Sequence, residues 1–164
     1  MTLYDLLNEG SAALQQAGDT DGENDAKLLL FEALHLDLVH FLMDRLRPLS
    51  EQDDKVQEQI RTYRGMIAKR ASRIPLQQIL GSQEFMGLDF FVNEHVLIPR
   101  QDTETLVELV LQEQQGPEKK LLDLCTGSGC IAISLAVKGG YESVTATDLS
   151  EEALQVAERN ARAH

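Results

Sequence analysis

A glycine-containing turn between an apolar strand and an apolar helix constrains the fold of this chain most. The turn is the run Leu122-Asp123-Leu124-Cys125-Thr126-Gly127-Ser128-Gly129-Cys130. Glycine adopts positive φ angles without a steric penalty, so it allows a tight turn and a close approach of the backbone to a ligand. The N–H groups at the start of the helix that follows favour electronegative ligand atoms. The run therefore predicts a strand, a ligand-binding turn and a helix.

The segments on both sides of this turn alternate between strand and helix patterns. Residues 120–124 and 143–147 have the length and apolar character of buried strands, whereas 131–137 and 151–163 have helical patterns. A further helix, capped by Thr103, is expected before the first strand. This alternation predicts a parallel sheet with right-handed connections, and hence an α/β fold.

Two carboxylates beside the turn indicate which ligand it binds. Asp148 follows the second strand, nineteen residues after Gly129, and a carboxylate at that place accepts hydrogen bonds from both hydroxyls of a ribose. The pattern Gly127-x-Gly129-x-x-Ala132 is compatible with a dinucleotide cofactor. However, Asp123 directly precedes the turn, where it would repel a pyrophosphate and suits a cationic group. S-adenosylmethionine is therefore favoured over a nicotinamide dinucleotide, and a tight turn without any ligand is the remaining alternative.

The N-terminal part of the chain, residues 1–73, is expected to be a small helical bundle. Leucines recur at helical spacing, and Gly18 supplies a stop after the first helix. Ser50 is the expected N-cap of the last helix, with Asp53 three residues further on. Residues 74–98 contain glycines and a strand-like run, which predicts a β-hairpin that links the two bodies.

Composition and charge exclude several classes of function. No apolar run reaches the roughly 20 residues that span a bilayer, and the N-terminus lacks a signal-peptide pattern, so we expect a cytoplasmic protein that binds no membrane. The net charge of −12 disfavours direct nucleic-acid binding. Cys125 and Cys130 are expected to be reduced, and the histidines show no metal-ligand spacing, so no metal is expected.

Residues 55–73 depart from this acidic character, because they hold six basic residues and one acidic residue. Such a segment is either a solvated helix face or a docking surface for a polyanionic or acidic partner.

Three stretches of the sequence resemble one family of enzymes. The first is residues 75–87, the second is residues 96–108, and the third is residues 123–131 together with Asp148. Together they are similar to the release-factor glutamine methyltransferases, the PrmC family that was formerly called HemK. The run Ile98-Pro99-Arg100-Gln101-Asp102-Thr103-Glu104 in the second stretch is the most specific part of the resemblance.

The resemblance covers essentially the whole chain and implies three parts. Residues 1–73 would be a helical substrate-docking domain, and residues 74–98 a β-hairpin linker. Residues 99–164 would be the N-terminal part of a class I, Rossmann-like methyltransferase domain that binds S-adenosylmethionine. This incomplete domain would contain two strands and two to three helices.

The resemblance also implies a set of cofactor-binding residues. The turn would line the methionine end of the cofactor, and Asp148 would bind the ribose. Arg100, Thr103 and Glu104 would close the entrance of the pocket, although a purely structural salt bridge between Arg100 and Glu104 is the alternative. Many members have glycine at the position of Cys125, and a β-carbon there is expected to need an ordinary φ. The turn residues concerned are Asp123, Cys125, Thr126, Gly127, Ser128 and Gly129.

The activity implied is methyl transfer to the glutamine amide in the Gly-Gly-Gln loop of peptide-chain release factors. The family's Asn-Pro-Pro-Tyr motif, which positions that amide, does not occur in this sequence. We therefore expect this chain to have no methyltransferase activity and an incomplete sheet. The alternatives are a methyltransferase for a ribosomal-protein glutamine, a nucleic-acid amino-methyltransferase, and a non-catalytic fragment that binds a release factor.

Overall fold

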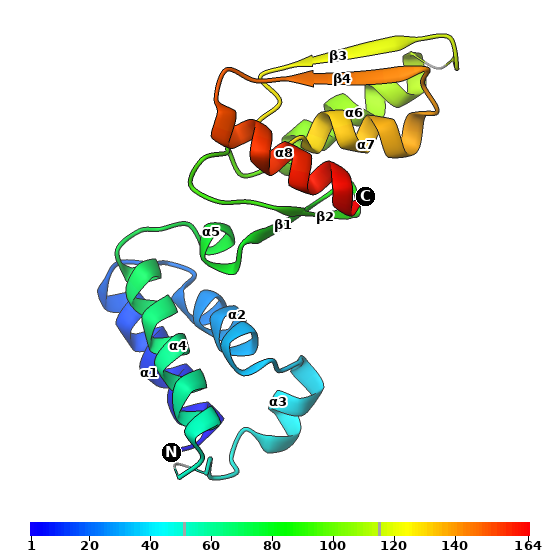
Figure 1. Ribbon diagram of the computed structural model, residues 1–164. Helices are drawn as coiled ribbons and strands as arrows, with labels where there is room; N and C mark the ends of the chain where they lie inside the picture. Colours follow the sequence, from blue (N-terminus) through cyan, green and yellow to red (C-terminus); the bar gives the residue numbers. More distant parts are fainter. Residues whose placement is uncertain (51, 115) are drawn as a thin grey trace. The chain divides into compact units, whose positions relative to one another are not determined.

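The computed structural model describes residues 1–50, 52–114 and 116–164. Backbone contacts divide the chain into two units, Met1–Leu80 and Gly81–His164. The first unit is helical, and the second combines helices with a hairpin and a parallel strand pair (Figure 1). This is the predicted order, a helical part followed by part of an α/β fold. No helix in the described part of the chain has both the length and the apolar character that crossing a membrane requires.

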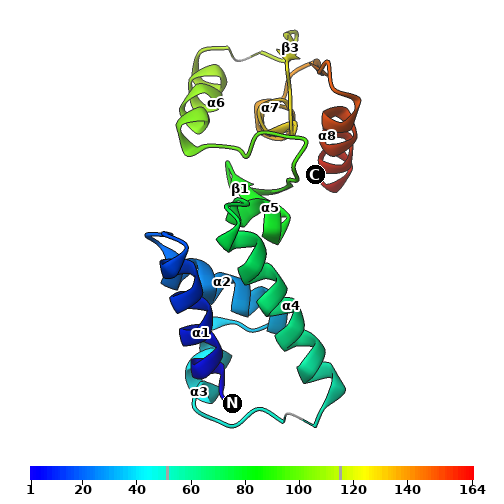
Figure 2. The ribbon, with the colours of Figure 1, turned by 90° about the vertical axis from the view of Figure 1, so that its left-hand side faces the viewer.

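The first unit is a bundle in which α4 lies beside α1 and α2 (Figures 1 and 2). Its helices are α1 (Leu3–Gln16), α2 (Gly22–Leu34), α3 (Leu38–Asp44), α4 (Asp54–Ala71) and α5 (Leu76–Leu80). Leu6, Leu14 and Leu29 are fully buried in its core. Tyr63 of α4 is also fully buried, and its hydroxyl donates a hydrogen bond to the Leu6 carbonyl oxygen at 3.1 Å.

Helices α1, α3 and α4 of the first unit begin with side-chain caps; that of α3 is Asp37, whose carboxylate accepts from the His40 N–H at 2.7 Å. The Thr2 hydroxyl accepts from the Asp5 N–H at 3.1 Å, while the Asp5 carboxylate accepts from the Thr2 N–H at 2.8 Å, a reciprocal capping box. The prediction of Ser50 as the N-cap of α4 is wrong, because the cap is Asp53, whose carboxylate accepts from the Lys55 N–H at 2.9 Å. The Ser50 carbonyl instead accepts the Asp53 N–H at 3.0 Å, so a turn precedes the helix.

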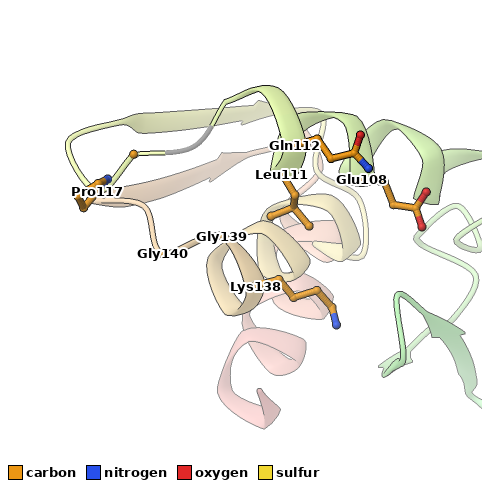
Figure 3. A pocket seen from close by; sticks show the side chains of 8 residues that line it. Glu108, Leu111, Gln112, Pro117, Lys138, Gly139 and Gly140 are labelled. Atoms are coloured by element: carbon orange, nitrogen blue, oxygen red, sulfur yellow. The ribbon is translucent and has the colours of Figure 1, made fainter.

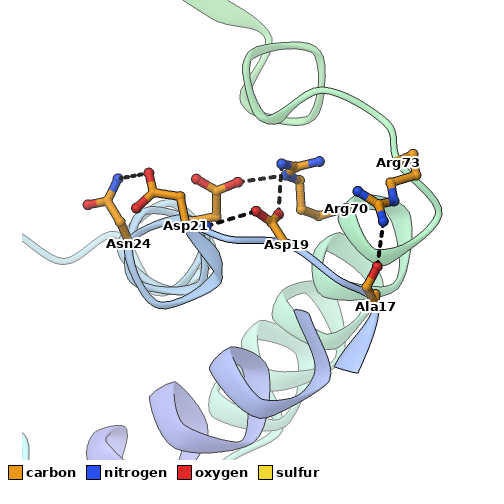
Figure 4. A network of polar contacts seen from close by, with 7 residues as sticks. Ala17, Asp19, Asp21, Asn24, Arg70 and Arg73 are labelled. Atoms are coloured by element: carbon orange, nitrogen blue, oxygen red, sulfur yellow. Dashed lines mark hydrogen bonds and ion pairs between the residues drawn. The ribbon is translucent and has the colours of Figure 1, made fainter. Parts of the chain in front are cut away.

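The arginines of residues 55–73 bind acidic or carbonyl groups of the first unit itself. Arg70 contacts both Asp19, at 2.7 Å, and Asp25, at 2.6 Å (Figure 4). Arg64 binds Glu9, at 2.7 Å. Arg61 pairs with Glu58 within α4, and Arg73 donates to the Ala17 carbonyl. Much of the local positive charge is therefore neutralised inside the unit, which weakens its interpretation as a docking surface.

The second unit begins with an antiparallel hairpin, which is followed by a helix and then by a strand–helix–strand–helix. Its elements are β1 (Ser82–Phe85), β2 (Leu88–Phe91), α6 (Gln101–Glu113), β3 (Lys120–Leu124), α7 (Cys130–Gly139), β4 (Ser143–Thr147) and α8 (Glu151–Ala163). The predicted strands at residues 120–124 and 143–147 and the predicted helix at 151–163 are confirmed with the same bounds. The predicted cap of α6 is wrong: Arg100 occupies the N-cap position, so Thr103 lies in the first turn.

Strands β3 and β4 are parallel, and their register runs from Lys120 opposite Ser143 to Leu124 opposite Thr147. Helices α6, α7 and α8 lie on one face of this sheet, as the two ribbon views show together (Figures 1 and 2). On the other face, Leu122 and Leu124 are 61% and 67% exposed. The carboxyl ends of both strands meet at one edge, which is where the glycine-containing turn lies.

Candidate cofactor site

The turn between β3 and α7 has an unusual backbone conformation. Cys125, Gly127 and Gly129 have φ angles of 60°, 57° and 81°. The expectation of an ordinary φ at Cys125 is therefore wrong, because the turn reverses too tightly for an extended residue there. A β-carbon in this left-handed region is strained by roughly 1–2 kcal/mol.

Hydrogen bonds to both strands hold the turn in this conformation. The Thr126 N–H donates to the Thr147 carbonyl at 2.9 Å, and the Thr126 hydroxyl donates to the Asp123 carboxylate at 2.7 Å. The Gly127 N–H donates to the Asp148 carboxylate at 2.8 Å. The structure thus brings Asp123, the turn and Asp148 together, as the two-carboxylate pattern predicted.

Asp148 is poised as a hydrogen-bond acceptor at the end of β4. Its second oxygen accepts the Ser150 N–H at 3.0 Å. The hydrogen bonds from Ser150 and Gly127 hold the pKa of Asp148 below its ordinary value, so the group is ionised at neutral pH. A carboxylate offers about four lone-pair sites, so this one retains sites for ligand hydroxyls. Leu149, the next residue, is 99% exposed and offers an apolar surface beside it.

The two glycines of the turn serve different needs. A β-carbon at Gly127 would meet no atom within 4 Å, so this glycine leaves space above the turn and supplies its positive φ. A β-carbon at Gly129 would lie 2.8 Å from Ile133 Cδ1 and 3.3 Å from Ala157 Cβ. Gly129 therefore allows α8 to pack closely against the start of α7. This arrangement of open backbone and convergent carboxylates fits the nucleoside and cationic ends of S-adenosylmethionine.

The other predicted site residues have different surroundings. The Glu104 carboxylate accepts a hydrogen bond from the Met86 N–H at 2.6 Å, in the tight turn of the hairpin where Met86 has a φ of 54°. Arg100 is exposed, and Thr103 is half-buried in the first turn of α6. Among the described residues, no hydrogen bond or ion pair joins Arg100 to Glu104, and none joins either of them to the glycine turn. Their role at a pocket entrance therefore stays a prediction.

Sequence reasoning missed Ser150 and Asn160 as residues of the site. Ser150 caps α8 through its hydroxyl, which accepts the Ala153 N–H at 3.1 Å, and its own N–H binds Asp148. Asn160 is 1% exposed and donates to the Ser128 carbonyl at 2.8 Å. The sequence does hold a sign of its burial. Asn160 lies at helical spacing on the same face as Ala153, Val156 and Ala157, and it is the polar residue of that buried face.

Both cysteines are free, but they differ in exposure. Cys125 is exposed on the turn, whereas Cys130 is buried at the start of α7. Burial raises the pKa of the Cys130 thiol, so this sulfur remains neutral at ordinary pH.

Two hollows in the second unit differ in their relation to the turn. The larger, 710 Å³, lies between the ends of α6 and α7 and the segment that precedes β3, and it is lined by Leu111, Pro117 and Lys138 among others (Figure 3). It contains none of the predicted site residues. A smaller hollow of 330 Å³ includes Gly129 and lies beside Ala132 and Ala157. The turn, where polar groups converge, is therefore the candidate site.

Comparison with known proteins gives matches in both units. The family model "PrmC N-terminal domain" matches residues 5–81, and "Methyltransferase small domain" matches residues 100–164. Several curated relatives are named "Release factor glutamine methyltransferase". The relative from Geobacter sulfurreducens is 39% identical, and the match covers 99% of this chain and 55% of the relative. The relative from Leptospira interrogans is 38% identical, and the match covers 98% of this chain and 54% of the relative. That of Koribacter versatilis is 40% identical over 98% and 56%. The chain spans about half the length of these relatives.

Proposed function

Because this chain belongs to the family of release factor glutamine methyltransferases, we propose that its protein methylates a glutamine side-chain amide of a peptide-chain release factor. The proposed methyl donor is S-adenosylmethionine, and the proposed target is the glutamine of a Gly-Gly-Gln loop. We also propose that the protein is cytoplasmic. The observation that carries it is the joint placement of Asp123, the glycine turn and Asp148 at one edge of the sheet.

The turn would hold the cofactor through distinct groups. Asp148 would accept hydrogen bonds from the ribose hydroxyls, and the open backbone at Gly127 would admit the methionine end. The negative charge of Asp123 would offset the positive charge of the cofactor. When bound, the cofactor supplies an electrophilic methyl group on a cationic sulfur. Cys125, Thr126, Ser128 and Gly129 would complete the lining, while Arg100, Thr103 and Glu104 stay proposed entrance residues.

Isothermal titration calorimetry of this chain with S-adenosylmethionine tests the cofactor site. We expect binding by the wild type and at least a roughly 100-fold loss in Asp148→Ala, because hydrogen bonds to a charged group contribute about 1.5–3 kcal/mol each. Glu142→Ala is a matched control, since it removes the same charge from an exposed ion pair with Lys120 at the other end of the sheet. Binding that survives Asp148→Ala would contradict the ribose assignment.

The methyl-transfer step itself needs groups that this sequence does not supply. The amide nitrogen of glutamine is a poor nucleophile because its lone pair is delocalised, so it must be oriented by hydrogen-bond acceptors. The family's Asn-Pro-Pro-Tyr motif would provide them, and it is absent from these 164 residues. We therefore propose that this chain binds cofactor and substrate without catalysing transfer. Methylation of a purified release factor by this chain, detected by mass spectrometry, would overturn that part of the proposal.

We also propose that the first unit docks the release factor, through α3 rather than through the arginines of α4. The outward face of α3 and the residues after it is apolar and exposed, whereas its Phe41 is buried. The charged neighbours form local pairs, Asp37 with His40 and Asp44 with Arg47. An exposed apolar patch with internally paired charges favours a protein surface over a polyanion. The face consists of Leu38, Val39, Leu42, Met43 and Leu46, which are 52% to 70% exposed.

Substitutions on α3 and on α4 test which of the two helices docks the release factor. Leu42→Glu with Met43→Glu is expected to abolish binding of a purified release factor in a pull-down or by calorimetry, because two charges would be buried against an apolar partner. Arg61→Glu changes an exposed residue of α4 and is expected to leave binding unchanged. The reverse pattern would assign docking to α4. Binding of S-adenosylmethionine should be the same in both variants.

A further inference from the structure

Asn160 of α8 connects three segments of the second unit through its side-chain amide. Its Oδ1 accepts the Phe91 N–H of β2 at 2.8 Å. Its Nδ2 donates to the Phe91 carbonyl at 3.0 Å and to the Ser128 carbonyl of the turn at 2.8 Å. The side chain is 1% exposed, so water does not replace any of these bonds.

The chemistry of the three partners requires asparagine at this position. An amide has two N–H donors and one carbonyl acceptor, and here both donors face carbonyls while the acceptor faces an N–H. Aspartate has the same shape but lacks both donors and would bring a charge next to two carbonyl oxygens. Alanine would leave the buried Ser128 carbonyl and the half-buried Phe91 N–H and carbonyl without this partner.

The bonds to Phe91 use groups at the free edge of the hairpin. In the register of β1 and β2, Phe91 lies opposite Ser82, and the neighbouring Val92 N–H donates to the Gly81 carbonyl at 3.1 Å. The N–H and carbonyl of Phe91 therefore point away from β1. Asn160 pairs with both of them, as a neighbouring strand would, and so fixes the position of α8 against the hairpin.

The bond to Ser128 acts on the glycine turn. Gly127 and Gly129, on either side of Ser128, have positive φ angles, so local preference alone determines the direction of this peptide weakly. The Gly129 N–H donates to the Thr126 carbonyl at 2.9 Å, while the carbonyl on the same peptide accepts from Asn160. Both sides of the Ser128–Gly129 peptide are thus anchored, one within the turn and one on α8.

We propose that Asn160 is a positioning residue for cofactor binding, which fixes the Ser128–Gly129 peptide of the turn and couples the turn to β2. This role deepens the proposed S-adenosylmethionine site and rests on it. Asn160 does not contact the cofactor. It keeps the turn in the conformation in which Gly127 and Asp148 face the ligand.

The test compares Asn160→Asp and Asn160→Ala with Val156→Ala in this 164-residue chain. Val156 lies on the same helix, is 3% exposed and packs with Val92 and Val96, so its truncation weakens the same unit without touching the turn. Two quantities are measured: the S-adenosylmethionine dissociation constant by calorimetry, and the Ser128 ¹³C′ and Gly129 amide shifts by NMR without ligand. The carbonyl shift reports directly on the hydrogen bond from Asn160, which a purely structural loss elsewhere does not move.

We expect the Ser128 and Gly129 shifts to move in both Asn160 variants and to stay in place in Val156→Ala. We also expect cofactor binding to weaken about tenfold in the Asn160 variants, the equivalent of one buried hydrogen bond, at a temperature where all three proteins are folded by circular dichroism. Unmoved shifts in Asn160→Asp, or equal weakening in Val156→Ala, would overturn the proposal. If the wild type binds no S-adenosylmethionine, the proposed cofactor is refuted while the shifts still decide whether Asn160 positions the turn.

Discussion

Arg70 should stabilise the fold of the first unit, and its replacement by methionine measures by how much. Its Nε lies 2.6 Å from an Asp25 oxygen and its Nη2 lies 2.7 Å from an Asp19 oxygen (Figure 4). The Asp19 oxygen lies off the N–H direction, so that contact is an ion pair without a well-aligned hydrogen bond. The side chains of Arg70, Asp25 and Asp19 are 19%, 8% and 10% exposed.

The magnitude follows from this burial. Removing one partner of a fully buried ion pair destabilises a protein by about 3–5 kcal/mol, whereas an exposed pair contributes about 0–1 kcal/mol. A fifth of the Arg70 side chain remains accessible to water, so some screening persists. We expect Arg70→Met to lower the local unfolding free energy by about 2–3 kcal/mol, chiefly because two carboxylates are left facing each other.

Hydrogen exchange followed by mass spectrometry is the suitable assay, because it resolves peptides of the two units separately. Exchange of α1, α2 and α4 peptides should accelerate roughly 30- to 140-fold in Arg70→Met. Arg61→Met is the matched control, since its pair with Glu58 is 67% exposed on both sides, and its exchange should change less than about threefold. Adding Asp19→Asn to Arg70→Met should restore part of the protection. Equal effects of Arg70→Met and Arg61→Met would refute the argument.

Further predictions concern Cys125, Gly10 with Gly65 as its comparison, and Asp148. Cys125→Gly should stabilise the second unit by about 0.5–1 kcal/mol, since relief of the left-handed β-carbon outweighs the added freedom of the unfolded chain; a thermal midpoint no higher than that of Cys125→Ser would contradict this. Gly10→Ala should destabilise the first unit by about 1–3 kcal/mol, because its β-carbon would lie 2.0 Å from the Tyr63 hydroxyl oxygen. Gly65→Ala, with no atom within 4 Å, should instead stabilise α4 in the same urea titration. Hydrogen bonds from the Ser150 and Gly127 N–H groups lower the pKa of Asp148, so its hydrogen bond to the turn should persist from neutral pH to below the ordinary pKa of 3.8. It should be lost only at still lower pH. An Asp148 ¹³Cγ titration midpoint at or above 3.8 would contradict this prediction.

The sequence predicted those parts of the second unit whose causes are local. Strands β3 and β4 and helix α8 have the predicted bounds, because short apolar runs and the Ser150 cap determine them within a few residues. The two carboxylates also met at the turn as expected, since parallel strands end at the same edge. Caps were harder to predict where two candidates lie close together, as with Ser50 and Asp53, because the path of the preceding turn decides between them.

The roles of Glu104 and Asn160 could not be predicted from local patterns. Glu104 binds the backbone of a residue eighteen positions earlier, and Asn160 binds Phe91 across sixty-nine positions. Such partners are set by how the hairpin packs against α6 and α8, and no spacing rule within one element encodes that. A family motif identified Glu104 as important, yet its observed contact is with the hairpin turn.

The basic segment on α4 illustrates why charge alone does not indicate a binding surface. Its excess of arginine and lysine is visible in the sequence, but the acids that pair with Arg64 and Arg70 come from α1, the α1–α2 connection and α2, about fifty residues away. Folding brings these groups together, so the charges of Arg64 and Arg70 are neutralised by acids of the same unit. The apolar face of α3 shows the converse. Its leucines have the spacing of a core helix, yet within α3 only Phe41 is buried. Docking variants should therefore target α3, and a charge reversal at Arg70 would report on folding instead.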